Sequence, residues 1–273
     1  FHYFYHMRFF DEKTAIDLEF DQIRSWLANF CVTETVADRL SKLQTYRDPK
    51  EVEYRLNLVH ELQLIRNRGV RFPRMEFEEL TREIQMLNIT ASVLELDGIV
   101  KILDASRFVN ELFLFFKEHR TEYFALKTLL EGAHYTKDIE NEIDKILDKR
   151  LHVKDNASTE LQHIRQSIVT RKKQINKNFD RALKTARGKG YIDDISENVI
   201  DNRRVMTVIS TFKRQIEGSI LGSSKTGSLT YVEPRVNQAL NFELDQLIDD
   251  ERKEIRRILA ELTNFMRSYV DLI

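Results

Sequence analysis

The spacing of apolar residues along the chain predicts a mostly helical protein. In successive segments between residues 11 and 147, apolar positions recur every three or four residues, as on one face of an α-helix. These segments are residues 11–30, 33–43, 48–66, 77–87, 91–119, 126–130 and 139–147. The stretch 67–75, which contains Gly69 and Pro73, is expected to be a loop. This part of the chain is therefore predicted to be an all-helical globular unit.

Two longer segments, 159–187 and 236–273, have narrower apolar stripes with nearly heptad spacing. Arg171 and Lys172 interrupt the first stripe, and Glu251 interrupts the second. A stripe of this width suits a helix that packs along one partner and is otherwise exposed to water. Since neither helix can bury its stripe alone, the two are expected to pair with each other.

The region between these helices has the pattern of short strands. Residues 198–200 and 203–209 flank Asp201-Asn202, which predicts two strands joined by a tight turn. A second strand pair is predicted at 218–221 and 229–232, around the loop 222–227. The predicted fold class is mainly α, with a helical body and two long helices carrying a small β-rich unit. The predicted divisions are residues 1–156 for the body, 157–190 for the outgoing helix, 191–235 for the β unit and 236–273 for the returning helix.

Composition agrees with long helices. The 273 residues include 8 Gly and 3 Pro. Together these are about a third of the ordinary share of the two residues, which is roughly 12%. The single Cys31 cannot form an internal disulfide, which favours a reducing, cytoplasmic setting. The sequence has no apolar run of about 18 residues, so no membrane association is expected.

Catalytic and metal-binding motifs are not found. The loop Gly222-Ser-Ser-Lys-Thr-Gly227 resembles a phosphate-binding loop in composition, but its Lys225 precedes the second Gly, against the spacing of that motif. One Cys and seven scattered His residues give no metal-ligand spacing, and no serine stands in a nucleophile motif. We therefore predict no catalytic residue, metal ligand or cofactor in this chain, and we do not expect the chain itself to be an enzyme.

Charge is more informative in its distribution than in its total. The net charge is −1, but residues 145–189 contain 13 Lys or Arg and 4 Asp or Glu. Such a basic stripe leading to a small unit is typical of proteins that bind the phosphate backbone of DNA. A solvated helix face, balanced by the acidic returning helix, explains the charge equally well. The candidate DNA-binding residues are Arg203, Arg204, Lys213, Arg214 and Lys225, followed by Arg171, Lys172 and Lys173.

Several segments in the same order resemble the MutS family. Residues 218–234 (GSILGSSKTGSLTYVEP), together with Asn241 and the sequence ERKEIRRIL at 251–259, are similar to the branch without the mismatch-reading N-terminal domain, the MutS-two branch. Residues 18–23 and 153–165 also resemble this branch, so the resemblance covers 16–273. The sequence departs from it at Leu221-Gly222, Thr226 and Leu229. The motif positions are Gly218, Ser224, Gly227, Glu233, Pro234 and Asn241.

The resemblance implies that the helical body is a core domain, that the two long helices form a lever, and that the β unit lies at a clamp end. It also implies a longer parent protein. That protein would be a homodimer that contacts the phosphate backbone of DNA and hydrolyses ATP with Mg²⁺. No Walker A sequence occurs here, so we expect this chain to be a fragment without the ATPase domain. The resemblance leaves open mismatch repair, recombination control and action on stalled ribosomes. The alternative is a helical coiled-coil protein that binds protein partners or has a structural role, with no contact with nucleic acid.

Overall fold

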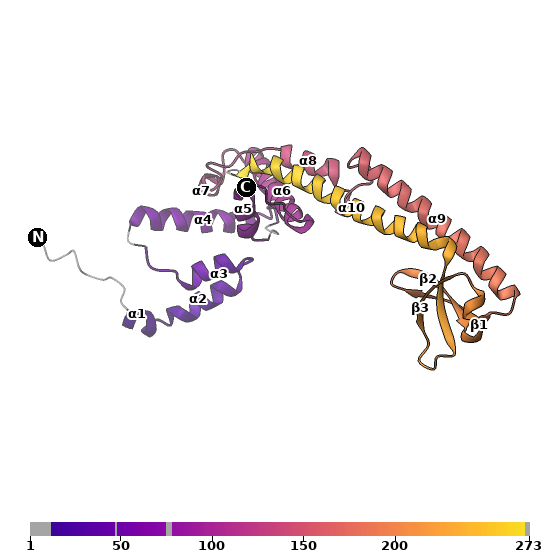
Figure 1. Cartoon of the computed structure of the whole chain (residues 1–273). Coiled ribbons are helices and arrows are strands. Elements are labelled where there is room, and N and C mark those ends of the chain that lie inside the picture. Colours follow the sequence, from indigo (N-terminus) through magenta and orange to yellow (C-terminus); the bar gives the residue numbers. More distant parts are fainter. Residues whose placement is uncertain (1–11, 47, 75–77, 271–273) are drawn as a thin grey trace, which may run out of the picture. The chain divides into compact units, whose positions relative to one another are not determined.

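The computed structural model describes residues 12–46, 48–74 and 78–270, and it divides the chain into two compact units. The first unit comprises residues 1–145 and 259–273, and the second comprises residues 146–258 (Figure 1). Helices predominate, and the described strands form one four-stranded antiparallel sheet. The predicted fold class is therefore confirmed, whereas the four predicted divisions stay a prediction.

The first unit is built from helices. Its core contains Ile65, Phe115, Phe116, Tyr123 and Leu126, which α4, α6 and the region of α7 contribute. The side chain of Glu61 on α4 accepts hydrogen bonds from the backbone N–H groups at the start of α7, over 2.8 and 3.0 Å. The helices are α1 (Glu12–Asp17), α2 (Phe20–Asn29), α3 (Glu34–Ser41), α4 (Pro49–Asn67), α5 (Thr81–Asn88), α6 (Leu96–Glu118), α7 (Phe124–Thr128) and α8 (Asp138–Ile146).

The helix predicted at 77–87 begins only at Thr81, and two other predicted helices of this unit contain residues with positive φ. The segment 11–30 is broken between α1 and α2, where Glu19 has a φ of 52°. The segment predicted at 91–119 begins only at Leu96, because Ala91 has a φ of 64° and the Leu94 N–H donates to the Thr263 hydroxyl. A residue in the left-handed region cannot continue a right-handed helix, so both predictions were too long.

The second unit joins two long helices to the sheet. Ser158 caps α9, and Asp201 and Asn202 both have positive φ, as the two-residue hairpin predicted between β1 and β2 requires. The strand order is β1-β2-β4-β3 with antiparallel pairing throughout. The elements are α9 (Thr159–Gly188), β1 (Ile192–Ile200), β2 (Arg203–Ile209), the 3₁₀ helix η2 (Ser210–Gln215), β3 (Gly218–Ser223), β4 (Leu229–Pro234) and α10 (Arg235–Arg267), whose last residues belong to the first unit.

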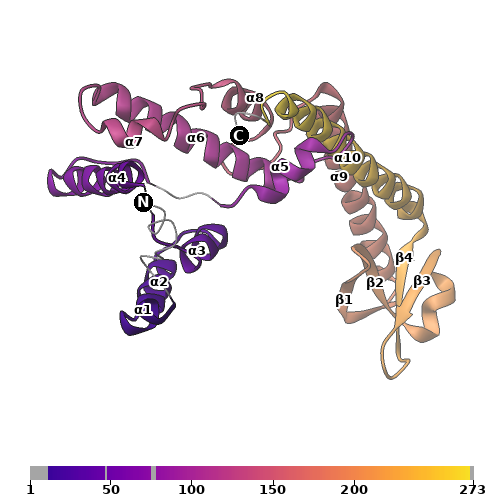
Figure 2. The same ribbon diagram turned by 90° about the vertical axis from the view of Figure 1, so that its left-hand side faces the viewer.

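The sheet packs on the C-terminal turns of α9. Phe179 and Ala186 from the helix lie against Met206, Val208 and Val232 from the two central strands, and all five are buried. Figure 2 shows the sheet at the end of the helix pair where α9 ends and α10 begins. The predicted strands are confirmed, but β1 begins six residues earlier than expected and η2 was not predicted.

Over the residues that the structure describes, no helix combines the length and apolarity needed to cross a bilayer. Within the same ranges, no three His, Cys, Asp or Glu side chains come together as ligands for a metal ion.

Candidate nucleic-acid interface

In the second unit, α9 and α10 lie side by side and run antiparallel, as Figure 1 shows. Their polar contacts follow the two helices in opposite directions, because the partner's residue number falls as the number on α9 rises. The expected pairing of the two long helices is thereby confirmed. The contacts join Ser158 to Glu254 (2.6 Å), Arg165 to Glu251 (2.7 Å), Arg171 to Glu243 (2.8 Å) and the Ile175 carbonyl to Asn237 (3.1 Å).

One interrupting charge of each apolar stripe has a partner across this pair, whereas Lys172 forms no ion pair among the described residues. Arg171, which breaks the stripe of α9, forms an ion pair with Glu243 of α10. Glu251, which breaks the stripe of α10, accepts a hydrogen bond from Arg165 of α9. These two interruptions are therefore cross-helix contacts and not defects in the packing.

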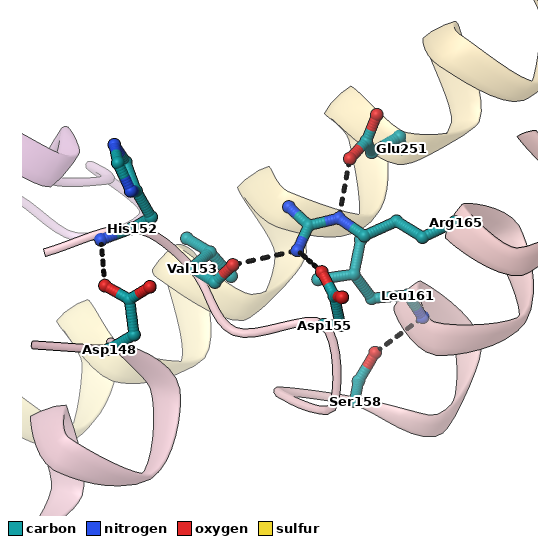
Figure 3. A network of polar contacts seen from close by, with 8 residues as sticks. All are labelled: Asp148, His152, Val153, Asp155, Ser158, Leu161, Arg165 and Glu251. Carbon is teal, nitrogen blue, oxygen red and sulfur yellow. Dashed lines mark hydrogen bonds and ion pairs between the residues drawn. The ribbon is translucent and has the colours of Figure 1, made fainter. Parts of the chain in front are cut away.

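Arg165 fixes the start of α9, as Figure 3 shows. Besides Glu251, its guanidinium donates to the Asp155 carboxylate over 2.5 Å and to the Val153 carbonyl over 2.8 Å. Burial opposes the charge of Arg165, but the hydrogen bonds to Glu251 and Asp155 outweigh it and raise the pKa of the guanidinium. One side chain thus connects the loop before α9 to α10.

Ser158 both caps α9 and contacts α10. Its oxygen accepts from the Leu161 N–H over 3.0 Å, and its hydroxyl donates to Glu254 over 2.6 Å (Figure 3). The hydrogen bond from Arg257 is the main cause that lowers the pKa of Glu254 to about 2, with burial acting against it and Ser158 adding to it. The buried Glu254 is therefore ionised at neutral pH.

The loop that leads to this end is closed by Asp148. Its carboxylate accepts from the backbone N–H groups of His152 (3.0 Å) and Arg150 (2.7 Å). The bond from His152 is the largest cause that lowers the pKa of Asp148, and burial opposes it. A bridge between Leu147 and Val153 completes the turn. We call the contacts of Arg165, Ser158 and Asp148 the proximal joint.

A second set of polar contacts connects the sheet to the start of α10. The carboxylate of Glu233, on β4, is only 1% exposed and accepts hydrogen bonds from Asn241 (2.5 Å) and Arg203 (3.3 Å). Arg203, on β2, also donates to Asp245 over 2.9 Å. Burial opposes the charge of Arg203, but the contacts with Asp245 and Glu233 raise the pKa of its guanidinium. We call these four residues, Arg203, Glu233, Asn241 and Asp245, the distal joint.

The remaining family-motif residues shape the β3–β4 hairpin. A Cβ on Gly218 would lie 2.1 Å from the Glu233 carbonyl oxygen, so only glycine fits there. Ser224 exchanges two hydrogen bonds with the Leu229 backbone, and Gly227 has a φ of 72°. Pro234 ends β4 and pairs with Gly218. The motif residues thus form the turn between β3 and β4 and part of the distal joint.

This hairpin does not fit the phosphates of ATP. Its loop joins β3 directly to β4, so no helix begins where a phosphate would have to bind. The prediction that the loop is a hairpin connection is confirmed.

Three of the four arginines among the candidate DNA-binding residues have internal partners. Arg203 belongs to the distal joint, and Arg171 pairs with Glu243. Arg204 contacts Glu197 and Asp180, and its guanidinium lies over the ring of Phe179 at 4.2 Å. These arginines therefore hold the sheet and the two helices together.

The five lysine and arginine candidates that remain are exposed. Lys213 and Arg214 lie on η2, and Lys225 lies at the tip of the β3–β4 loop. Lys172 and Lys173 lie on α9. Among the described residues, none of these five forms an ion pair or a side-chain hydrogen bond. The structure thus separates the sequence candidates into three with ion pairs and five without an ion pair or side-chain hydrogen bond among the described residues.

Comparisons with known proteins bear on this arrangement. No protein-family model matches the chain. It is 27% identical over 258 residues to a protein named endonuclease MutS2 from Aquifex aeolicus (strain VF5), an alignment that covers 94% of this chain and 34% of that protein. The chain is similar to MutS2 proteins.

Two further MutS2 proteins give the same result. The identity is 28% over 267 residues with endonuclease MutS2 of Staphylococcus haemolyticus and 27% over 262 residues with that of Clostridium perfringens (strain SM101 / Type A). These alignments cover 95% and 94% of this chain. The chain spans about a third of the length of the MutS2 relatives that it matches. This similarity supports the relation to MutS2 that the segment 218–259 predicts.

Sequence reasoning missed the polar connections of both joints. In the sequence, Glu251 is only an interruption of an apolar stripe. No sequence pattern marks Arg165 as the partner of Glu251 or Ser158 as the partner of Glu254. One signal for such contacts was present in the sequence. The two apolar stripes expected to pair are interrupted by charges of opposite sign, Arg171 in one and Glu251 in the other. Glu233 and Asn241 were found only through the resemblance, because no local pattern marks a buried carboxylate.

Proposed function

We propose that this chain is the core, lever and clamp part of a MutS-like protein and that its β unit contacts DNA. The observation that carries the proposal is the set of unbonded cations on the small β unit, next to a helix pair fixed at both of its ends. The similarity to MutS2 proteins over 94% of the chain supports a DNA-related role.

The contacts with DNA would come from Lys213, Arg214 and Lys225. An exposed cation without an internal partner loses no ion pair when it binds a phosphate, whereas Arg203 would have to leave the distal joint. Lys172 and Lys173 on α9 form a second contact set. Phosphate contacts carry no sequence information, so binding would be independent of sequence and would weaken with salt.

In the longer protein, this part would connect an ATPase that uses ATP and Mg²⁺ to the DNA. Helices transmit displacement well because their backbone hydrogen bonds are internal, and the two joints resist sliding of α9 against α10. We expect that protein to be a homodimer and to act in mismatch repair or recombination control, with the ribosome as another partner to be tested.

The test is the affinity of the 273-residue chain for duplex DNA, measured by fluorescence anisotropy over a range of salt concentrations. The variant Lys213→Ala/Arg214→Ala/Lys225→Ala should weaken binding by about tenfold or more and lower the salt slope by roughly 2 to 3, at about 0.9 per lost phosphate contact.

A matched control removes three exposed cations elsewhere. Lys50, Arg82 and Lys127 lie in the first unit, are exposed and have no ion pair among the described residues. Their triple alanine variant has the same net charge as the test variant. If both triple variants bind DNA like the parent, or lose affinity equally, the β unit is not the contact surface. If the parent does not bind DNA at low salt, the partner-binding coiled-coil alternative replaces the proposal.

A further inference from the structure

A hollow of about 440 Å³ lies in the second unit. It is bounded by the last turns of α9, the segment from η2 to β3, and the start of α10. Small-molecule sites in proteins commonly have volumes of about 300 to 1,000 Å³. The hollow is therefore large enough for one planar heterocycle with its sugar.

One part of the lining is apolar and aromatic. Ala182 and Ala186 from α9 and Ile216 from the segment after η2 form an apolar surface. The ring of Tyr191 also lines the hollow and stacks on Phe212, with centroids 5.0 Å apart and ring planes at 26°. A ring held in this way offers a fixed surface to a planar ligand.

The other part of the lining is cationic. Arg181, Lys189 and Arg235 line the hollow, and Glu217 is the one acidic side chain among the described lining residues. Glu217 lies 4.0 Å from Arg235, whereas Arg181 and Lys189 form no ion pair among the described residues. The Lys189 ammonium lies 6.0 Å from the centroid of the Tyr191 ring, which places a positive charge beside the aromatic wall. The hollow thus has a net positive charge.

We propose that this hollow binds a nucleotide. The base would lie on the apolar surface beside Tyr191, and the phosphate would contact Arg181 and Lys189. Inorganic phosphate would leave the apolar wall unused, and a neutral apolar molecule would leave both cations without a counterion. Bases stack on aromatic side chains without sequence preference, which suits an unpaired strand.

The inference rests on the proposed function in one respect, because that function makes DNA the expected source of the nucleotide, and a base can reach the hollow only from an unpaired strand. A free mononucleotide has the same chemistry. The site differs from the duplex contacts proposed above, since none of Lys213, Arg214 and Lys225 lines the hollow.

The test places a large side chain in the hollow and leaves Arg181 and Lys189 unsubstituted. Thr185 is exposed, lines the hollow, and donates its hydroxyl to the Arg181 carbonyl one turn earlier. Thr170 is equally exposed on α9, makes the same bond to the Gln166 carbonyl, and does not line the hollow. The variants Thr185→Phe and Thr170→Phe therefore form a matched pair, and circular dichroism checks that both keep the helical content of the parent.

Binding of a fluorescein-labelled oligothymidylate is measured by anisotropy, with thymidine monophosphate as a competitor and duplex DNA in a separate titration. We expect Thr185→Phe to weaken oligothymidylate binding by about tenfold, on the scale of one lost base stack, and Thr170→Phe to leave it unchanged. Duplex affinity should be the same for both variants.

The outcomes separate the two proposals. Equal oligothymidylate affinity for the two variants, or no binding by the parent, overturns the nucleotide site whatever the duplex titration gives. If the parent does not bind duplex DNA but binds oligothymidylate, and Thr185→Phe abolishes that binding, the duplex contact is overturned and the nucleotide site is kept. If thymidine monophosphate displaces the labelled oligomer from the parent as well as unlabelled oligothymidylate does, the site is assigned to free nucleotides, whereas much weaker displacement assigns it to an unpaired strand.

Discussion

Replacement of Glu233 by alanine tests the distal joint directly. In the native chain, this carboxylate is 1% exposed and receives hydrogen bonds from Asn241 on α10 and Arg203 on β2. The substitution removes both bonds while leaving the fold of β4 possible, since alanine fits any strand. It leaves the Asn241 amide, which is 6% exposed, without its acceptor.

The size of the effect follows from these contacts. A buried donor left without a partner costs about 1 to 3 kcal/mol, and removal of one partner of a buried charged pair costs about 3 to 5 kcal/mol. Arg203 keeps Asp245 and its side chain is 31% exposed, so the second figure is an upper limit here. We expect Glu233→Ala to destabilise the sheet by about 3 kcal/mol.

Hydrogen exchange measures this cost locally. A loss of about 3 kcal/mol should accelerate amide exchange roughly a hundredfold where exchange requires opening of the sheet. The informative amides are those of the β2–β4 ladder, where Met206 faces Val232. The amides of α6 in the first unit serve as the internal reference, because they are remote from the substitution in the sequence and belong to the other unit.

Glu217→Ala is the matched control for this prediction. Glu217 also belongs to the second unit, but its side chain is 84% exposed and its nearest cation, Arg235, lies 4.0 Å away. Exposed ion pairs contribute little to stability, so its loss should leave exchange in the sheet nearly unchanged. If Glu233→Ala accelerates exchange no more than Glu217→Ala does, the distal joint does not hold the sheet and the reasoning is refuted.

Two further predictions concern the hairpin and the proximal joint. Gly218→Ala should destabilise the sheet severely in hydrogen exchange, because its Cβ would meet a backbone oxygen at 2.1 Å, whereas Gly188→Ala, with open space around the added methyl group, should not; equal effects would contradict the close approach. Since the pKa of Glu254 is lowered from 4.5 to about 2 in the folded chain, its carboxylate should stabilise the folded state above about pH 4.5 and lose this contribution as the pH falls to about 2. A pH series of urea unfolding should show this part of the decline in the parent and not in Glu254→Gln, and identical pH profiles would count against the role of Glu254.

Periodicity was sufficient to predict the two long helices and the hairpins, although the helix predicted at 236–273 ends at Arg267. The helix predicted at 159–187 is α9 at Thr159–Gly188, and the turn at Asp201-Asn202 has the expected backbone. These features depend on local sequence, which a pattern of apolar and turn residues reports directly. The break at Glu19 was not predictable in the same way, because nothing in its composition distinguishes a glutamate in the left-handed region from one in a helix.

The candidate interface was predictable only in part. The sequence identifies every cation of the β unit, but the bonded state of each depends on residues far away in the chain, as in the contact between Arg203 and Asp245. The hollow beside Tyr191 brings together α9, the segment after η2, and the start of α10, which no spacing rule connects. Distribution of charge along the sequence therefore predicts a basic surface but not which cations are available to a ligand.

The polar contacts between α9 and α10 explain how two similar apolar stripes reach a single register. Leu and Ile side chains tolerate a slide by one helical turn, since the next apolar residue takes the place of the last one. A slide of one turn moves the helices by about 5 Å, which would separate Arg171 from Glu243 and Arg165 from Glu251. Fixing the register is the best-attested role of polar groups within an apolar helix interface. Contacts of this kind oppose sliding of one helix along the other, and this is the property that the proposed transmission between an ATPase and DNA would require.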